Sequence, residues 1–298
     1  MEEGFRSGFV ALIGRPNVGK STLLNLLVGQ KVAIMSDKPQ TTRNTIRGIY
    51  TRENCQLIFI DTPGIHKPRT KLGDYMVEVA QNTLSEVDLI LLLVDAKEGL
   101  GPGDRWIIEQ LKPVKTPVFL VINKIDLVHP NDLLPLIDQY RKLYDYAEIV
   151  PISALKGNNA QTLINLLVKY MPEGPQYYPS DQVTDYPERF IIAEIIREKI
   201  LHLTREEIPH SIAVDIESIM PREEEEGLFV SAVIYTERES QKKIVIGKGG
   251  AMLKKVGIMA RKELEALLGT CLYLDLWVKV KKDWRNRVEQ LHLFGYNQ

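Results

Sequence analysis

The first part of the chain alternates short apolar runs with stretches of helical character. The strand-like runs lie at residues 9–13, 46–51, 55–60, 88–94, 117–122 and 148–152. Strands that alternate with helices form mostly parallel sheets with helices on both faces. The pattern therefore predicts an α/β domain, closed by a helix around residues 163–168.

The pattern changes after a stretch that is rich in proline. Prolines at 172, 175, 179 and 187 suit a stiff linker better than a helix or a strand. Beyond it the order reads helix, strand, strand, helix, helix, strand, which predicts a second domain of the α+β class. The predicted limits are 1–174 for the first domain, 175–189 for the linker and 190–298 for the second domain.

A glycine loop, Gly14–Ser21, follows the first strand and precedes a helical stretch. In this setting glycines let backbone N–H groups wrap a polyphosphate at the helix N-terminus. Lys20 would reach the β- and γ-phosphates, and the Ser21 hydroxyl would ligate Mg²⁺. A chance glycine turn is the competing interpretation, and the strand–loop–helix context argues against it. The predicted nucleotide contacts here are Gly14, Asn17, Val18, Gly19, Lys20, Ser21 and Thr22.

The segment Asn123–Asp126 follows an apolar run, at the strand end where α/β sheets bind ligands. The Asp126 carboxylate can accept hydrogen bonds from N1–H and the 2-amino group of guanine, neither of which adenine offers. The sequence therefore predicts GTP rather than ATP, with Asn123 and Lys124 bracing the loop. Backbone N–H groups of Ser153, Ala154 and Leu155, after the last strand, would face the guanine O6.

Two further segments predict groups around the metal and the γ-phosphate. Asp61 ends a strand and would hold Mg²⁺ through water, while the Gly64 N–H would contact the γ-phosphate. Thr41 and Thr42 lie in a polar, unpatterned stretch, and one of their hydroxyls would complete the Mg²⁺ shell. Our prediction is Thr42, although adjacent threonines cannot be separated by sequence.

Taken together, these segments resemble the TRAFAC class of GTPases, and the form GRPNVGKS with QTTR at residues 40–43 resembles its Era-type bacterial branch. One departure from the Ras-like pattern is Ile65, in the position of the glutamine that orients water. The isoleucine side chain forms no hydrogen bonds, so the catalytic group is not visible in the sequence, and the resemblance implies slow hydrolysis. Asn17 either helps to bind K⁺ in place of an arginine finger or only shapes the loop.

The second domain contains a Gly-x-x-Gly loop, Gly247–Gly250, between two apolar or helical segments. In KH domains such a loop clamps the backbone of about four nucleotides. The alternatives are a plain turn and a solvated charged face, but basic residues flank the loop and the element order resembles the Era-type KH domain. The predicted RNA contacts are Lys242, Lys243, Gly247, Lys248, Gly249, Gly250, Lys254 and Lys281.

The resemblance implies a GTP-hydrolysing switch that binds small-subunit ribosomal RNA near its 3′ end and assists assembly of the small ribosomal subunit. The implied cofactors are GTP or GDP and Mg²⁺, and the expected state is a monomer. The alternative is a GTPase whose second domain docks on a protein or on anionic lipid instead of RNA. No base preference follows from the residues themselves.

Composition fits this interpretation. Hydrophobic residues make up 44% and charged residues 26%, with a net charge of −1, as in ordinary globular proteins. Cys55 and Cys271 lie in strand-like contexts, which predicts two buried thiols in a reducing cytosol. The acidic N-terminus does not resemble a signal peptide, and no run reaches transmembrane length. We expect a cytoplasmic protein, with peripheral association at the inner face of the cell membrane as the alternative.

Overall fold

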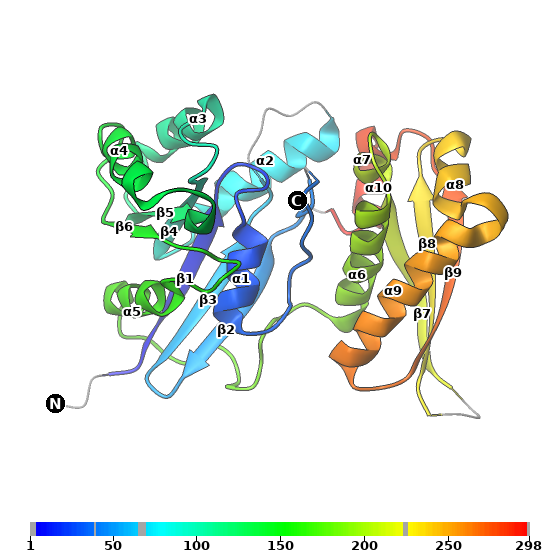
Figure 1. The fold of residues 1–298 in the computed structure, drawn as a ribbon. Helices are drawn as coiled ribbons and strands as arrows, with labels where there is room; N and C mark the ends of the chain where they lie inside the picture. The colour runs from blue at the N-terminus through cyan, green and yellow to red at the C-terminus, as the bar shows by residue number, and fades with distance from the viewer. Residues whose placement is uncertain (1–3, 39, 65–69, 223–225, 297–298) are drawn as a thin grey trace. The chain divides into compact units, whose positions relative to one another are not determined.

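The structure of the chain is a computed structural model that describes residues 4–38, 40–64, 70–222 and 226–296. It divides into two compact units. The first comprises Met1–Met35, Thr42–Arg69 and Gly73–Asp185, and the second comprises Ser36–Thr41, Thr70–Leu72 and Tyr186–Gln298. Figure 1 labels the helices and strands of both units.

The first unit is built on a six-stranded sheet in the order β2-β3-β1-β4-β5-β6. Only β2 runs antiparallel to its neighbour, so the predicted mostly parallel sheet is confirmed. The strands are β1 Arg6–Ile13, β2 Ile46–Arg52, β3 Cys55–Asp61, β4 Leu89–Asp95, β5 Val118–Asn123 and β6 Glu148–Pro151. The helices are α1 Lys20–Val28, α2 Lys71–Thr83, α3 Pro102–Leu111, α4 Pro130–Arg141 and α5 Ala160–Tyr170, with a 3₁₀ turn, η1, at Ile125–Leu127.

Helices cover both faces of this sheet. Side chains of α2, α3 and α4 form one core with the strands, while α1 and α5 lie on the other face (Figure 1). Every residue of β3, β4 and β5 is therefore buried, which explains why these strands are continuous apolar runs in the sequence. Because β1, β3, β4 and β5 are parallel, their carboxyl ends share one edge of the sheet.

The second unit has a three-stranded sheet in the order β7-β8-β9, with β7 and β8 antiparallel and β8 and β9 parallel. Apolar residues of α6, α8 and α9 form its core with the strands, and the predicted α+β class of this domain is confirmed. The strands are β7 Ala213–Pro221, β8 Leu228–Thr236 and β9 Leu272–Val280. The helices are α6 Glu188–Leu203, α7 Ile208–Ser211, α8 Glu239–Ile246, α9 Ala251–Leu268 and α10 Val288–Leu293, with 3₁₀ turns η2 at Lys248–Gly250 and η3 at Trp284–Asn286.

The stretch that the sequence presents as a linker follows the surface of the first unit. The Gln56 side chain donates to the Tyr178 carbonyl and accepts from the backbone N–H groups of Tyr177 and Tyr178. The Thr184 hydroxyl donates to the carbonyl of Arg47 on β2. These contacts place the proline-rich stretch with the first unit as far as Asp185.

The prediction of two buried thiols is wrong for one cysteine. Cys55 is buried in β3, but Cys271 is exposed. Since β9 begins at Leu272 with an inward side chain, the residue before it points outward.

Candidate nucleotide and nucleic-acid sites

The loop Gly14–Ser21 runs from β1 to α1 in a conformation that requires glycine at two positions. Gly14 has φ 151°, and a Cβ there would lie 2.4 Å from the carbonyl oxygen of Leu93. Gly19 has φ 101°, and a Cβ there would lie 2.2 Å from Nδ2 of Asn123. Any larger residue at these positions would push the loop away from the ends of the strands. Both glycines are therefore needed for the loop to lie this close to β4 and β5.

Lys20 is buried inside this loop. Its ammonium donates to the carbonyl oxygens of Gly14 at 3.2 Å and Arg15 at 3.1 Å. Burial lowers the pKa of Lys20 to about 8, against the opposing effect of the Asp61 carboxylate. A polyanion beside it would favour the charged form, so the side chain is placed to hold phosphate oxygens.

Three oxygen-bearing side chains converge beside Lys20. The Ser21 hydroxyl donates to Oδ2 of Asp61 at 2.6 Å and lies 3.0 Å from Oγ1 of Thr42, which is 3.3 Å from the same carboxylate oxygen. The other oxygen of Asp61, Oδ1, is buried and has no hydrogen-bond partner among the described residues. Burial raises the pKa of Asp61 to about 6, although Lys20, Ser21 and Thr42 oppose this shift.

Such a set of hard oxygen donors, with one buried carboxylate oxygen unsatisfied, fits Mg²⁺. The two adjacent threonines are separated by the fold. Thr42 is buried beside Ser21 and Asp61, whereas the Thr41 hydroxyl donates to the carbonyl of Lys38 at 2.6 Å.

The residues at the end of β5 and directly after it form hydrogen bonds with the glycine loop. The Asn123 amide donates to the Val18 carbonyl at 2.8 Å and accepts from the Ala154 N–H at 2.9 Å. The Lys124 ammonium donates to the Asn17 carbonyl at 2.8 Å. These bonds join three loops into one frame.

The remaining residues of the predicted base pocket lie at the same edge. The Ser153 hydroxyl donates to Oδ1 of Asp126 at 2.6 Å, which orients the carboxylate. Asp126 and Leu155 are both exposed. A carboxylate that is oriented and open to solvent is placed to accept the two donors of a guanine edge.

After Asp61 at the end of β3, the structure describes the chain as far as Gly64. A Cβ on Gly64 would lie 2.8 Å from Cα of Pro16, so this glycine sits directly against the phosphate loop. Ile65, which replaces the Ras-like glutamine, lies outside the described residues.

Two parts of this site escaped the sequence interpretation. Asp95 pairs with Lys124 at 2.5 Å, and Arg15 pairs with Asp104 of α3 at 2.8 Å. Asp95 ends a buried apolar strand just as Asp61 does, and that signal could have found it. Asp104 has no comparable local signal, because its partner lies far away in the sequence.

In the second unit, Gly247–Gly250 forms the turn between α8 and α9. Gly247, Gly249 and Gly250 have φ values of 75°, 61° and 80°. A Cβ on Gly247 would lie 2.7 Å from Cβ of Met252, so the turn excludes a side chain there. Lys248 is exposed at its tip.

A groove of about 470 Å³ runs beside this turn between α9 and β9. Two of its lining residues, Gly250 and Lys254, are among the predicted RNA contacts. The others share no motif and come together only when the strand packs beside the helix. The lining residues are Gly250, Leu253, Lys254, Gly257, Ile258, Arg261, Tyr273, Leu274 and Leu276.

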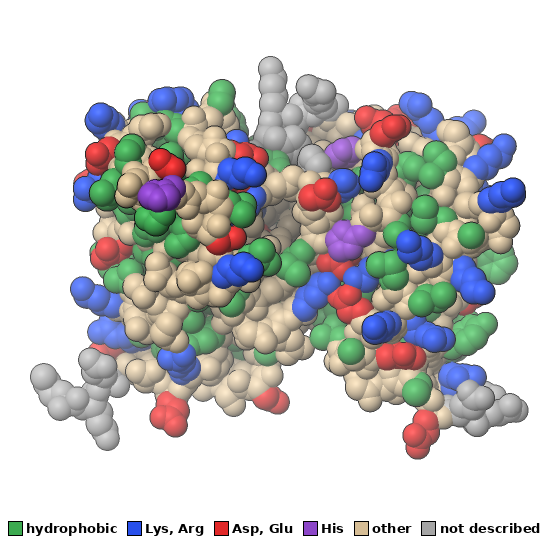
Figure 2. All heavy atoms as spheres, viewed as in Figure 1, with side chains coloured by type: hydrophobic (Ala, Val, Ile, Leu, Met, Phe, Trp, Pro, Cys, Tyr) green, Lys and Arg blue, Asp and Glu red, His purple; other side chains and the backbone are tan. Residues whose placement is uncertain are grey.

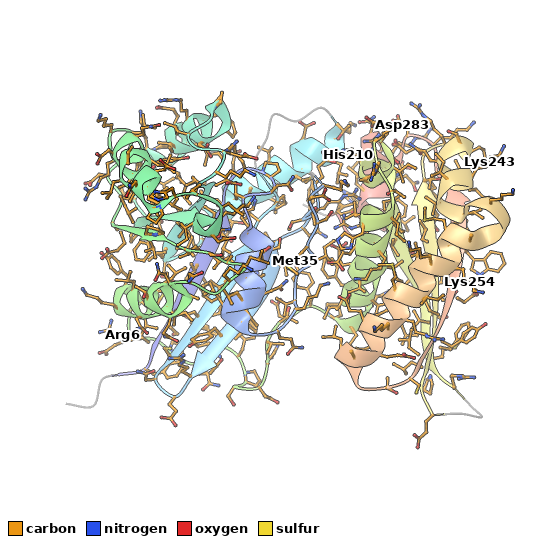
Figure 3. All side chains as sticks on the ribbon, viewed as in Figure 1. Arg6, Met35, His210, Lys243, Lys254 and Asp283 are labelled. Carbon is orange, nitrogen blue, oxygen red and sulfur yellow. The ribbon has the colours of Figure 1, made fainter. Side chains whose placement is uncertain are left out.

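Basic side chains gather over α8 and α9 on the face that Figure 2 shows. Figure 3 labels two of the predicted RNA contacts there, Lys243 on α8 and Lys254 on α9, and both are exposed. Lys242, also on α8, is half-buried. Lys281 lies elsewhere, with its ammonium 5.6 Å from the ring centroid of Tyr235, and it does not line the groove.

Comparisons with known proteins match both units of the chain. A family described as 50S ribosome-binding GTPase matches residues 9–124, and the KH domain family matches residues 207–285. The chain is 49% identical to Era in a crystal structure with MgGDPNP and nucleotides 1506–1542 of 16S ribosomal RNA, and the match covers 99% of this chain and 100% of that one with a TM-score of 0.96.

A second solved structure, a variant of Aquifex aeolicus Era bound to GDP and AlF₄⁻, is 48% identical over the same shares of both chains, with a TM-score of 0.95. In the part of the chain that the structure describes, no helix has both the length and the apolar character needed to cross a membrane.

Proposed function

Because this chain belongs to the Era family of GTPases, we propose that it is a GTP-hydrolysing switch that binds small-subunit ribosomal RNA near its 3′ end and assists small-subunit assembly. The observation that supports this proposal most strongly is the presence of two separate phosphate-binding loops in one chain. One has a buried lysine beside a set of oxygen-bearing side chains, and the other lies beside a groove lined by apolar residues, Tyr273, Lys254 and Arg261.

Each unit carries one part of this function. Residues 1–174 would bind and hydrolyse GTP, residues 190–298 would bind RNA, and residues 175–189 would connect them. The contacts of Tyr177 and Tyr178 with Gln56 support the proposal that the connection starts from a fixed point on the first unit.

At the nucleotide, Lys20 would hold the β- and γ-phosphates while the Asp126 carboxylate accepts the guanine donors. Asn123 and Lys124 keep the phosphate loop and the base pocket at a fixed separation through their bonds to Val18 and Asn17. A rigid frame of this kind lowers the ordering cost of binding. The backbone N–H of Gly64, beside the phosphate loop, would detect whether a γ-phosphate is present.

Ser21 and Thr42 would bind Mg²⁺ directly, and Asp61 would hold it through water. When bound, Mg²⁺ neutralises the negative charge on the phosphate oxygens. The fold offers a matched test, because only one of two adjacent threonines reaches this cluster. Thr42→Ala should lower hydrolysis and raise the Mg²⁺ concentration required for it, whereas Thr41→Ala should not. Equal effects of the two variants would contradict the assignment.

Hydrolysis should be slow without an activator, because Ile65 cannot orient water by a hydrogen bond. The two roles open to Asn17 are distinguished by comparing hydrolysis in KCl and NaCl. A K⁺ site predicts a faster rate in KCl that Asn17→Ala abolishes. A purely structural role predicts the same rate in both salts.

In the second unit, the backbone at Gly247–Gly250 would contact RNA phosphates, since its three glycines have no Cβ to keep them away. The groove beside it offers apolar and aromatic surface for bases together with Lys254 and Arg261 for phosphates. Both features suit a single strand rather than a duplex.

The deciding experiment is to isolate the protein from cells with a non-hydrolysable GTP analogue and to sequence the RNA that copurifies. We expect enrichment of the 3′ region of small-subunit ribosomal RNA. A variant in which Lys248 and Gly249 are both aspartate serves as the control, because it should lose the RNA and keep GTP binding. RNA-independent binding to vesicles of anionic lipid, without RNA enrichment, would favour the docking alternative instead.

A further inference from the structure

The side chain of Arg15, in the phosphate loop, is directed toward the start of α3. Its Nε donates to Oδ1 of Asp104 at 2.8 Å, and its Nη1 lies 3.2 Å from Oε2 of Glu98. Asp104 is completely buried, and its other carboxylate oxygen accepts the backbone N–H of Gly101 at 2.8 Å. One carboxylate thus holds both the beginning of α3 and the guanidinium of the phosphate loop.

A slot for the Arg15 side chain is left open by two glycines. A Cβ on Gly103 would lie 2.7 Å from Cδ of Arg15, and a Cβ on Gly101 would lie 3.3 Å from its Nη1. Neither glycine has a positive φ, so the backbone does not require glycine at either position. The absence of side chains there is explained by the room that Arg15 occupies.

The loop before α3 is also connected to the base pocket. One oxygen of Asp95 accepts the backbone N–H groups of Lys97 and Glu98, and the other pairs with Lys124. Lys124 in turn donates to the Asn17 carbonyl. The phosphate loop is therefore attached to the segment 95–104 at two points, through Asn17 and through Arg15.

We propose that Arg15 is a positioning residue of the GTP site, which anchors the phosphate loop to α3 through Asp104 in the slot beside Gly101 and Gly103. Its guanidinium is committed to two carboxylates while its backbone carbonyl accepts the Lys20 ammonium. The side chain therefore keeps Lys20 and the loop amides where phosphates meet them, and it does not act on the phosphates itself.

This assignment predicts which kinetic constant responds to removal of the side chain. A positioning residue affects GTP and GDP alike, since both use the same loop, so affinity falls while the turnover number at saturating GTP is kept. A residue that stabilised charge in the transition state would show the opposite pattern.

The first test replaces Arg15 by methionine, which keeps an aliphatic stem and removes the charge. We expect the affinities for GTP and for a fluorescent GDP analogue to fall together by about ten- to a hundredfold, as for supporting residues around other sites. Turnover at saturating GTP should stay close to wild type. Arg105→Met is the matched control. Arg105 is an exposed arginine on α3, next to Asp104, and its replacement should leave both constants unchanged.

A double variant separates positioning from simple stability. Arg15→Met leaves the buried Asp104 carboxylate without its charged partner, which should lower the midpoint of thermal unfolding without nucleotide. Adding Asp104→Asn removes the buried charge and should recover the midpoint, but it should not recover the affinity because the loop still lacks its anchor. Arg15→Lys, which can still pair with Asp104, should recover part of the affinity.

Gly103→Ala gives an independent test, since alanine favours the helix and at the same time fills the slot. It should weaken nucleotide binding, while the gain in helix propensity should make the drop in the midpoint of thermal unfolding smaller than in Arg15→Met. The inference would be overturned if Arg15→Met lowered turnover and kept affinity, or if affinity recovered together with stability in the double variant. It rests on the proposed GTP site, and wild-type GTP binding measured in the same titrations tests that site separately.

Discussion

The two glycine loops of this chain both precede a helix and both use glycines at positive φ, yet they are held differently. Gly14–Ser21 has a buried lysine inside it and is fixed from outside by Asn123 and Lys124. In Gly247–Gly250 the lysine is exposed. We call Gly14–Ser21 the fixed loop and Gly247–Gly250 the open loop.

The difference matches the ligands. A single nucleotide offers few contacts, so its site gains most when loop and base pocket are ordered before binding. An RNA strand offers many phosphates, and each one that is bound adds affinity by releasing counterions without demanding one geometry. An exposed loop at the start of a helix is therefore sufficient to bind RNA phosphates. The following variants, from the largest expected effect to the smallest, test whether the two loops differ in this way.

The largest effect is expected at the fixed loop. Lys20→Met removes a buried ammonium from the phosphates and should cost about 3–5 kcal/mol of GTP binding, which is roughly a hundredfold to several thousandfold in affinity. The midpoint of thermal unfolding without nucleotide should change little, because burial disfavours the charged lysine in the empty site. Nucleotide titration and thermal unfolding of the same preparations measure both. A large drop in stability with GTP binding intact would make Lys20 a structural residue.

At the predicted guanine pocket, which lies next to the phosphate loop, we expect a change of nucleotide specificity. Asp126→Asn should cost about 2–3 kcal/mol of GTP binding, because it exchanges a charged acceptor for an amide. Xanthine carries a carbonyl where guanine has its amino group, and the asparagine can donate to it. Discrimination against xanthosine triphosphate should therefore relax in competition titrations. Unchanged GTP affinity would remove Asp126 from the base pocket.

At the open loop, replacing both Lys248 and Gly249 by aspartate should lower affinity for single-stranded RNA by about tenfold or more. The logarithmic slope of affinity against salt should flatten by about one for each phosphate that the variant no longer binds. Lys255→Asp, an exposed charge reversal on α9 outside the groove, should have the smaller effect. Hydrolysis of GTP without RNA should remain near wild type. Equal affinity and slope in the double variant would rule out RNA binding at this loop.

The smallest effect is expected from one ring in the groove. Stacking of a base on an aromatic side chain is worth about 1–3 kcal/mol, so Tyr273→Ala should weaken RNA binding within that range and keep the salt slope. Trp277→Ala is the control, because Trp277 is an exposed aromatic residue of the same strand that does not line the groove. If both variants weakened binding equally, the groove would not be the path of the RNA.

Local pattern was sufficient to predict most elements of the first unit and the motifs on them. Helices bury both faces of β3, so residues 57–60 before Asp61 are all apolar. The end of this strand could therefore be predicted from the point where the apolar run stops. The glycine loop was equally visible, since its residues are adjacent in the chain. In the second unit, the turn at Gly247–Gly250 could be recognised from its glycines and the lysines around it.

The exposure of Cys271 could not be predicted in the same way. Its neighbours alternate as in a strand, and the strand's first residue decides which side each residue faces. That start depends on where the turn after α9 ends. If the strand started one residue earlier or later, each side chain would face the opposite side of the sheet. The alternating pattern therefore predicted the strand correctly but the burial of the Cys271 thiol wrongly.

The sequence by itself determined which residues could bind phosphate, metal and guanine, because those residues lie in short segments whose chemistry is local. Only the tertiary structure decided that Thr42 rather than Thr41 reaches Ser21 and Asp61, and that Arg15 pairs with Asp104, 89 positions away. Each of these interactions joins segments that are distant in the chain. The packing of strands and helices brings such segments together, and no pattern within either segment specifies its partner.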